Sequence, residues 1–206
     1  MGILSSSSSI TRYLVKGKPD IPAYEFVEKA LKANSIPEID ESVSGKVIGW
    51  TSFETPYRAD FSGSSFSYGS FFVFSLRMDK KVLSPKIVQK YIAIETEKRL
   101  KSTGREFLSA DEKKMIKDHV VNLLNLRIPA TPNIYDLIWD HDKETLWFFT
   151  TLKSANEELE TLFFKSFKLS LIRLFPYTMA DLASDLSGSH KDELARLSPI
   201  SFYNNG

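Results

Sequence analysis

Lysine and arginine side chains are concentrated between residues 79 and 127, and they are the residues best suited to bind a charged partner. This segment carries 12 Lys and Arg against 7 Asp and Glu, whereas the rest of the chain carries 15 against 19. The net charge of the whole chain is only +1, so a polyanion would be selected by where the cations lie. The candidate binding residues are Lys80, Lys81, Lys86, Lys90, Lys98, Lys101, Arg105, Lys113, Lys114 and Lys117.

The spacing of three of these lysines predicts a common face. At about 100° per residue, Lys86, Lys90 and Lys101 fall within roughly 60° of arc on a helix, while Ile87 and Tyr91 point the other way. Several cations along one element suit a phosphate backbone, which requires no contact with particular bases. The alternative is a protein-interaction module, in which the lysines only solvate the outer faces of two helices.

Four acidic residues near one turn suggest a second kind of chemistry. Asp136, Asp140, Asp142 and Glu144 supply the oxygen ligands that Mg²⁺ and Ca²⁺ prefer, so a metal-dependent nuclease is an alternative function. The EF-hand spacing is absent, and so are the Walker loop and the GxSxG motif. A turn with Asp at its corners needs no metal. We therefore expect no catalytic residue, no metal site and no cofactor.

Aromatic residues form a further group between Thr55 and Gly69. They are interleaved with Arg58 and small residues, as in proteins that stack single-stranded bases on rings. A single arginine gives little attraction for phosphates. The favoured interpretation is a long connection whose aromatic rings fold back onto the core.

The composition is that of an ordinary globular domain. The chain has 206 residues, 42% of them hydrophobic, which indicates one domain or one domain with an inserted lobe. It has no cysteine, which excludes disulfides and thiolate metal sites, and its apolar runs are far too short to cross a bilayer. With no export signal, we expect a cytoplasmic location and no membrane partner.

Hydrophobic periodicity predicts alternating strands and helices. Strands are expected at Ile10–Lys16, Lys46–Phe53, Ser70–Met78, Ile134–Trp139, Thr145–Thr151 and Leu169–Phe175. Helices are expected from Asp20 to Asn34, from Ser84 to Ser102, from a capping box at Ser109 to Pro129, from a second capping box at Ser154, and twice within 178–197.

This order predicts an α+β fold with two parts. Residues 1–79 and 133–206 would form an antiparallel or mixed central sheet with packed helices. Residues 80–132 would form a basic helical hairpin that projects from the sheet as an inserted lobe.

Several short motifs follow one another in a familiar order. Gly49-Trp50 and the strand Phe71–Arg77 precede Lys80–Pro85 at the start of a helix. Further along come Glu112-Lys113-Lys114, Ile116-Lys117-Asp118, Leu123-Leu124, Arg127, Trp139-Asp140 and Ser154-Ala155. Over about residues 10 to 178, the chain resembles the RdgC family of bacterial recombination-associated proteins.

The resemblance implies a protein that binds DNA without sequence preference and favours the duplex. It also implies association with the nucleoid, control of homologous recombination through the RecA recombinase, and a homodimer. One contact between the two copies would involve Leu126, Ile128 and Pro129 in the lobe. In the family, such a dimer forms a ring around the duplex. Members continue beyond the point that corresponds to Gly206 and build a second contact between the copies there. This chain resembles a shortened member, for which an open clamp, a dimer joined at one contact or another assembly are alternatives to the closed ring.

Overall fold

The computed structural model describes residues 2–19, 21–40, 42–63, 65–183 and 186–197. The strands are β1 (Thr11–Lys16), β2 (Lys46–Ser52), β3 (Ser67–Tyr68), β4 (Phe71–Lys80), β5 (Thr131–Asp140), β6 (Thr145–Phe148) and β7 (Ser170–Leu174). The helices are α1 (Ala23–Ala33), α2 (Pro85–Thr103), α3 (Ala110–Asn125), α4 (Lys153–Phe167), α5 (Pro176–Ala183) and α6 (Gly188–Arg196). None of the described helices is long and apolar enough to cross a membrane.

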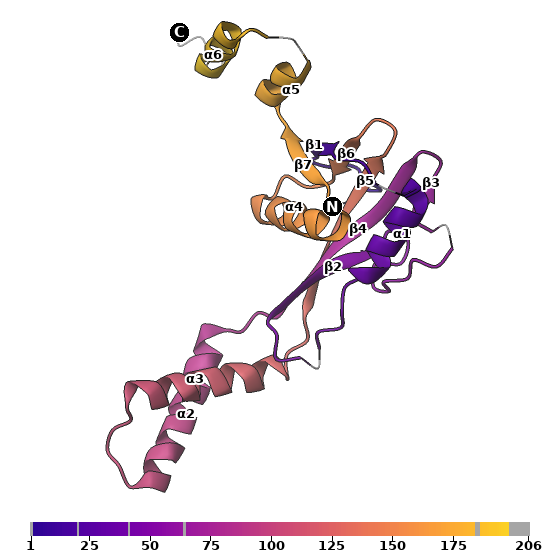
Figure 1. The fold of residues 1–206 in the computed structure, drawn as a ribbon. Helices are drawn as coiled ribbons and strands as arrows, with labels where there is room; N and C mark the ends of the chain where they lie inside the picture. The colour runs from indigo at the N-terminus through magenta and orange to yellow at the C-terminus, as the bar shows by residue number, and fades with distance from the viewer. Residues whose placement is uncertain (1, 20, 41, 64, 184–185, 198–206) are drawn as a thin grey trace.

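The strands form one antiparallel sheet in the order β2-β4-β5-β6-β1-β7, with the short β3 also paired to β4. The α+β fold expected from the sequence is confirmed. Strands β4 and β5 pair along their whole length, from Phe71 opposite Asp140 to Lys80 opposite Thr131. This pair leads out of the sheet and continues into the helical hairpin of α2 and α3 (Figure 1).

The hydrophobic core lies on one face of the sheet, under α1 and α4. Alternate residues of β4 point to this face, so Phe72, Phe74 and Leu76 are buried while their neighbours face the other way. Helix α4 contributes Phe163 and Phe167, whose rings contact each other at a centroid distance of 4.6 Å. Aromatic packing therefore holds the helical layer against the sheet.

A buried polar network joins β1, α4 and β7 at the edge of this core. The Tyr13 hydroxyl lies 2.7 Å from Asn156 Oδ1 and 2.9 Å from Glu160 Oε1. Arg173 Nη2 donates to the same Glu160 oxygen at 2.9 Å. Burial and the neighbouring Glu160 raise the pKa of Tyr13, so its hydroxyl keeps its proton and remains a hydrogen-bond donor.

The starts of both lobe helices and the end of α2 lie where the sequence predicts, although the Ser84 side chain makes no capping hydrogen bond. Helix α3 ends at Asn125, four residues before the expected end at Pro129. Helix α2 has Ser84 as its N-cap and Pro85 in its first turn, and it ends at Gly104 in the left-handed conformation with φ of 63°. At α3, the Ser109 side chain accepts from the Glu112 amide, and the Glu112 side chain accepts from the Ser109 amide. The capping box at Ser109 is thus confirmed.

The second predicted capping box is wrong. Helix α4 begins at Lys153 with Leu152 as its N-cap, and no side chain caps it. The amide group of Asn156 donates back to the Leu152 carbonyl oxygen at 2.8 Å, so the first turn is stabilised from inside the helix rather than by Ser154. Asp20, the expected start of the first helix, lies outside the described residues, and α1 has Pro22 as its N-cap.

Several strand boundaries also differ from the prediction, mostly by one residue, and β6 ends at Phe148 rather than Thr151. Strand β4 continues to Lys80, and β5 begins at Thr131 rather than Ile134 because the β4–β5 ladder runs on toward the lobe. Pro132 is tolerated in this ladder since β6 pairs only with the far end of β5, from Leu137 to Asp140. The two-residue strand β3 is too short to leave a periodic signal.

The close approach of β2 to the chain after α1 gives a test of the fold. A methyl group at Gly49 would lie 2.4 Å from the Cα and 2.5 Å from the backbone nitrogen of Ile36. We predict that Gly49→Ala lowers the free energy of unfolding by about 2–3 kcal/mol, since the backbone must shift to accept it. Gly45→Ala is the control, because its nearest neighbour would be 3.9 Å away. Equal urea midpoints for the two variants would contradict this packing.

Candidate nucleic-acid interface

The predicted cations lie on the helical lobe and on the strand that leads to it. Lys86, Lys90, Lys98 and Lys101 are exposed on α2. Because α2 is a continuous helix, the shared face that the sequence predicts for Lys86, Lys90 and Lys101 follows from its geometry. A second group, Lys113, Lys114 and Lys117, is exposed on the first half of α3.

Three of the predicted cations are paired with acidic side chains of the lobe itself. Lys101 Nζ lies 2.6 Å from Glu97 Oε1, and Lys98 Nζ lies 3.8 Å from Glu95 Oε1. Arg105 Nη1 lies 3.2 Å from Glu112 Oε1. The hydrogen bond from Lys101 lowers the pKa of Glu97. Exposed pairs of this kind contribute little stability, so a phosphate oxygen can replace the carboxylate at small cost.

The remaining exposed cations are available without breaking an ion pair. Within the described parts of the chain, Lys80, Lys86, Lys90, Lys113, Lys114 and Lys117 make no salt bridge. The ammonium of Lys90 lies 5.8 Å from the centre of the Tyr91 ring, a contact that leaves it in solvent. Arg99 and Arg127 are further exposed cations of the lobe that were not among the candidate binding residues predicted from the sequence.

Lys81 does not belong to this set, and its prediction as a binding residue is wrong. It is only 5% exposed. Its ammonium donates to the carbonyl oxygens of Asp40 and Ser42 at 2.9 Å and of Asn125 at 2.6 Å. A buried ammonium requires such partners because desolvation is otherwise very costly. Lys81 therefore fastens the end of α3 to the loop before β2, at the junction of lobe and sheet.

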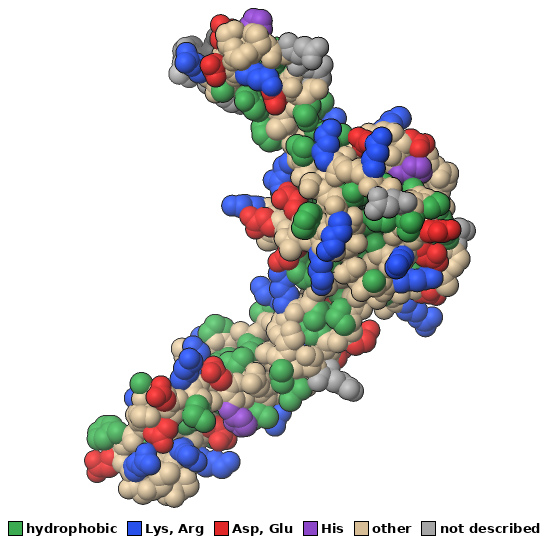
Figure 2. Space-filling view, viewed as in Figure 1, with side chains coloured by type: hydrophobic (Ala, Val, Ile, Leu, Met, Phe, Trp, Pro, Cys, Tyr) green, Lys and Arg blue, Asp and Glu red, His purple; other side chains and the backbone are tan. Residues whose placement is uncertain are grey.

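The cations do not form one uninterrupted surface. An open groove of about 420 Å³ separates α2 from α3, and its lining includes Glu95, Arg99, Met115 and His119. By helical geometry, Lys86 and Lys90 lie on the side of α2 that faces away from this groove. Figure 2 shows acidic and apolar side chains between the cations of the lobe. The arrangement is a set of separated positive charges on a rod-like element.

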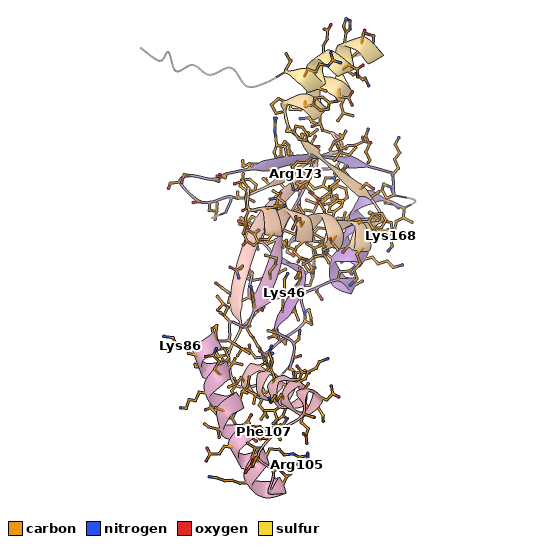
Figure 3. The ribbon with its side chains drawn as sticks, turned by 90° about the vertical axis from the view of Figure 1, so that its left-hand side faces the viewer. Lys46, Lys86, Arg105, Phe107, Lys168 and Arg173 are labelled. Carbon is orange, nitrogen blue, oxygen red and sulfur yellow. The ribbon has the colours of Figure 1, made fainter. Side chains whose placement is uncertain are left out.

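The whole molecule is curved, and further cations lie along its concave side. In Figure 1 the lobe and the arm formed by α5 and α6 both extend to the same side as α4. Figure 3 looks onto this side, where Lys46, Lys86, Lys168 and Arg173 are labelled. Lys46 is paired with Glu158 and Arg173 with Glu160. Lys46, Lys168 and Arg173 were not predicted from the sequence because they come from separate segments that only the fold brings together.

The residues expected at a contact between two copies lie where α3 returns to the sheet. Leu126 is 46% exposed at the C-cap of α3, Pro129 is exposed, and Ile128 is half-buried. A small groove next to them is lined by Tyr91, Leu123 and Arg127, among others. The lobe thus offers apolar side chains to a partner at this position. Helix α2 beside them has no buried residue, so its side chains are also accessible to a partner.

Three of the four acids at the β5–β6 hairpin, Asp136, Asp140 and Asp142, have structural partners. Asp136 accepts hydrogen bonds from the Ser75 hydroxyl at 2.7 Å and from the Ile3 amide at 3.0 Å. Asp140 is buried and accepts from the Lys143 amide at 3.0 Å, while His141 pairs with Asp142. Among the described residues, no three His, Asp or Glu side chains are grouped so that they could hold a metal ion.

The aromatic segment between β2 and β4 mostly folds back on the core, as expected. Phe61 and Phe66 are buried, and the Phe66 ring stacks on Tyr24 at a centroid distance of 5.1 Å. Tyr57 and Tyr68 are the exceptions, at 67% and 43% exposed, and Tyr57 lies under the Arg77 guanidinium. The described part of the segment offers two exposed rings, eleven residues apart, rather than a continuous series on which successive bases could stack.

Comparisons with known proteins add no functional information. No family model matches the chain. No curated protein matches it either. The resemblance to the RdgC family therefore stays a prediction from the sequence motifs.

Two adjacent lysines separate a structural role from a binding role. We predict that Lys81→Met lowers the free energy of unfolding by about 3 kcal/mol, because three carbonyl groups lose a charged donor at a site closed to water. Lys80→Met is the matched control, since Lys80 is exposed and unpaired. Its stability should match that of the unaltered protein. Equal stability of both variants in urea would contradict the role assigned to Lys81.

Proposed function

We propose that this chain is a non-enzymatic, sequence-independent DNA-binding protein, in which the helical lobe contacts the phosphate backbone. The observation that carries the proposal is the set of exposed, unpaired lysines on α2 and α3. Cations at intervals along a rod can neutralise phosphates and release counterions without reading base edges. The exchangeable ion pairs of Lys98, Lys101 and Arg105 extend this set.

The charge spacing favours double-stranded DNA. Lys86 and Lys90 are four residues apart, about 6 Å along the axis of α2. The two strands of a duplex together present one phosphate per about 1.7 Å of axis, a far denser charge than one strand alone offers. Lysines at fixed, separated positions on the lobe can each contact a phosphate more readily when the phosphates are more closely spaced, as they are on a duplex. The 55–69 segment exposes only Tyr57 and Tyr68 among its described aromatic residues, which gives successive single-stranded bases little surface to stack on and supports the same choice.

We further propose that two copies act together. The exposed Leu126 and Pro129, with Ile128 beside them, offer an apolar contact at the base of the lobe. Two lobes bound to one duplex would strengthen binding, because the second contact becomes intramolecular. The resemblance to the RdgC family supports the wider role, in which such a dimer acts at the nucleoid and restrains RecA during homologous recombination.

The groove between α2 and α3 supports a second candidate function, that of a protein-interaction module. Its lining includes Ile116 and Met115, which is 70% exposed, and a groove of this kind suits an apolar segment of another protein. In that case the lysines would serve only to solvate the lobe. The nuclease alternative has weaker support, because Asp136 and Asp140 have structural hydrogen bonds.

Charge reversal on the lobe tests the DNA-binding proposal. We predict that Lys86→Glu, Lys90→Glu and Lys101→Glu together weaken binding to a 30-bp duplex at least about a hundredfold and reduce the slope of log K against log salt by about 3. Both are measured by fluorescence anisotropy between 50 and 200 mM salt.

The matched control reverses the same number of charges outside the lobe, on the helices and loops that surround the sheet. Lys18, Lys29 and Lys153 are exposed residues outside the lobe, and their change to Glu alters the net charge equally. Affinity should then fall much less and the salt slope should change little. Equal losses in both variants would show that binding depends on total charge rather than on the lobe. No binding by the unaltered protein would favour the protein-interaction module.

The contact between copies has its own test. We predict a solution mass of two chains by sedimentation, and at least about tenfold weaker association for Leu126→Asp, because a carboxylate would be buried without a partner. Met115→Asp is the control, since Met115 is more exposed and lies in the groove rather than at the expected contact. A single-chain mass for the unaltered protein would contradict the dimer.

A further inference from the structure

An aromatic ring stands in solvent at the end of the lobe farthest from the sheet. Phe107, in the loop between α2 and α3, is 81% exposed, more than any other aromatic residue in the described ranges. Figure 3 labels it beside Arg105 at this end of the lobe. Exposure of an apolar side chain forgoes about 25 cal/mol for each Å² left in water, so the Phe107 ring adds little to folding stability and is free to contact a partner.

The loop that carries Phe107 is fixed on both sides. Gly104 ends α2 in the left-handed conformation, and the capping box of Ser109 and Glu112 starts α3. The residue next to Phe107, Leu108, is buried at 7% exposure. The Arg105 guanidinium forms an ion pair with the Glu112 carboxylate across the loop. The loop that carries the Phe107 ring is therefore held in place by the capped ends of α2 and α3.

Positive charges outnumber negative charges in the segments that flank this ring, with six cations against the four acids Glu97, Glu106, Asp111 and Glu112. Helices α2 and α3 are joined here, so the last turns of one and the first turn of the other lie at the same end of the lobe (Figure 1). The cations of these turns are Lys98, Arg99, Lys101, Arg105, Lys113 and Lys114. Lysine is depleted in the cores of protein–protein interfaces, where an exposed Phe would otherwise be expected to dock. An exposed Phe with cations on both sides fits DNA better than a protein partner, because the cations can contact the phosphate backbone while the ring makes an apolar contact between them.

We propose that Phe107 is a wedge that inserts between stacked base pairs of the duplex. This inference rests on the proposed function, because the surrounding cations must hold the DNA against the loop. Proteins that insert apolar side chains from a basic surface unstack a base step, and the bent duplex then contacts more of the protein. The ring has no hydrogen-bonding group, so insertion is compatible with binding that ignores base sequence. Flexible pyrimidine–purine steps would be entered most readily.

The experiment measures binding and unstacking on the same DNA. A 30-bp duplex carries 2-aminopurine, whose fluorescence rises when it is unstacked, at several TA steps. Anisotropy of a dye at one end reports binding. We expect the saturated protein to raise the 2-aminopurine signal at least about twofold, and Phe107→Ala to abolish the rise while affinity falls less than about tenfold. Phe107→Leu keeps an apolar wedge and should retain most of the rise.

Two controls make each outcome informative. Met115→Ala removes another strongly exposed apolar side chain of the lobe and should keep the full rise. Circular dichroism verifies that each variant is folded. Binding without any rise, or an equal rise for Phe107→Ala, would overturn the wedge and leave the proposed function standing. Absence of binding by the unaltered protein would overturn both. A lower solution mass for Phe107→Ala would instead identify Phe107 as a contact between copies and would also overturn the wedge.

Discussion

The junction between sheet and lobe depends on one buried ammonium group. Lys81 follows directly on β4, and its three carbonyl partners come from the loop before β2 and from the end of α3. Its neighbour Asn125 is also buried, and its side-chain amide donates to the Val43 carbonyl oxygen at 3.0 Å. These contacts fix the direction in which α2 and α3 leave the sheet. A basic lobe can hold a duplex in a defined position only if its base is rigid, so every functional proposal here depends on this junction.

The lobe itself is a rod with little interior of its own. No residue of α2 is buried, and α3 buries only Val120, Leu124 and Asn125. The helix ends are instead determined by local chemistry, with Gly104 and the Ser109 capping box at the far turn. The sheet has the opposite character, since aromatic rings from β4, β5 and α4 fill its core. The sheet thus provides stability, and the lobe carries an exposed surface whose charges face solvent.

The fold was largely predictable from local patterns, whereas the binding surface was only partly so. The Ser84-Pro85 start and the Ser109 capping box are local signals, and both are present in the structure. Lys80 and Lys81 are equivalent in sequence, yet one is exposed and the other buried, because burial depends on residues more than forty positions away. The pairing of Glu97 with Lys101 could have been predicted from its i,i+4 spacing. Nothing in the sequence distinguishes the exposed Phe107 from the buried Leu108 beside it.

The central claim is that duplex DNA lies against the cations of the lobe. Lysine footprinting tests it directly: the protein is acetylated lightly with and without a 30-bp duplex, and each site is quantified by mass spectrometry. The account predicts protection of Lys86, Lys90, Lys113, Lys114 and Lys117, with Lys29 and Lys153 unchanged and Lys81 unreactive in both samples. Protection of Lys29 and Lys153 in place of the lysines on α2 and α3 would contradict this claim, and so would the absence of any protection.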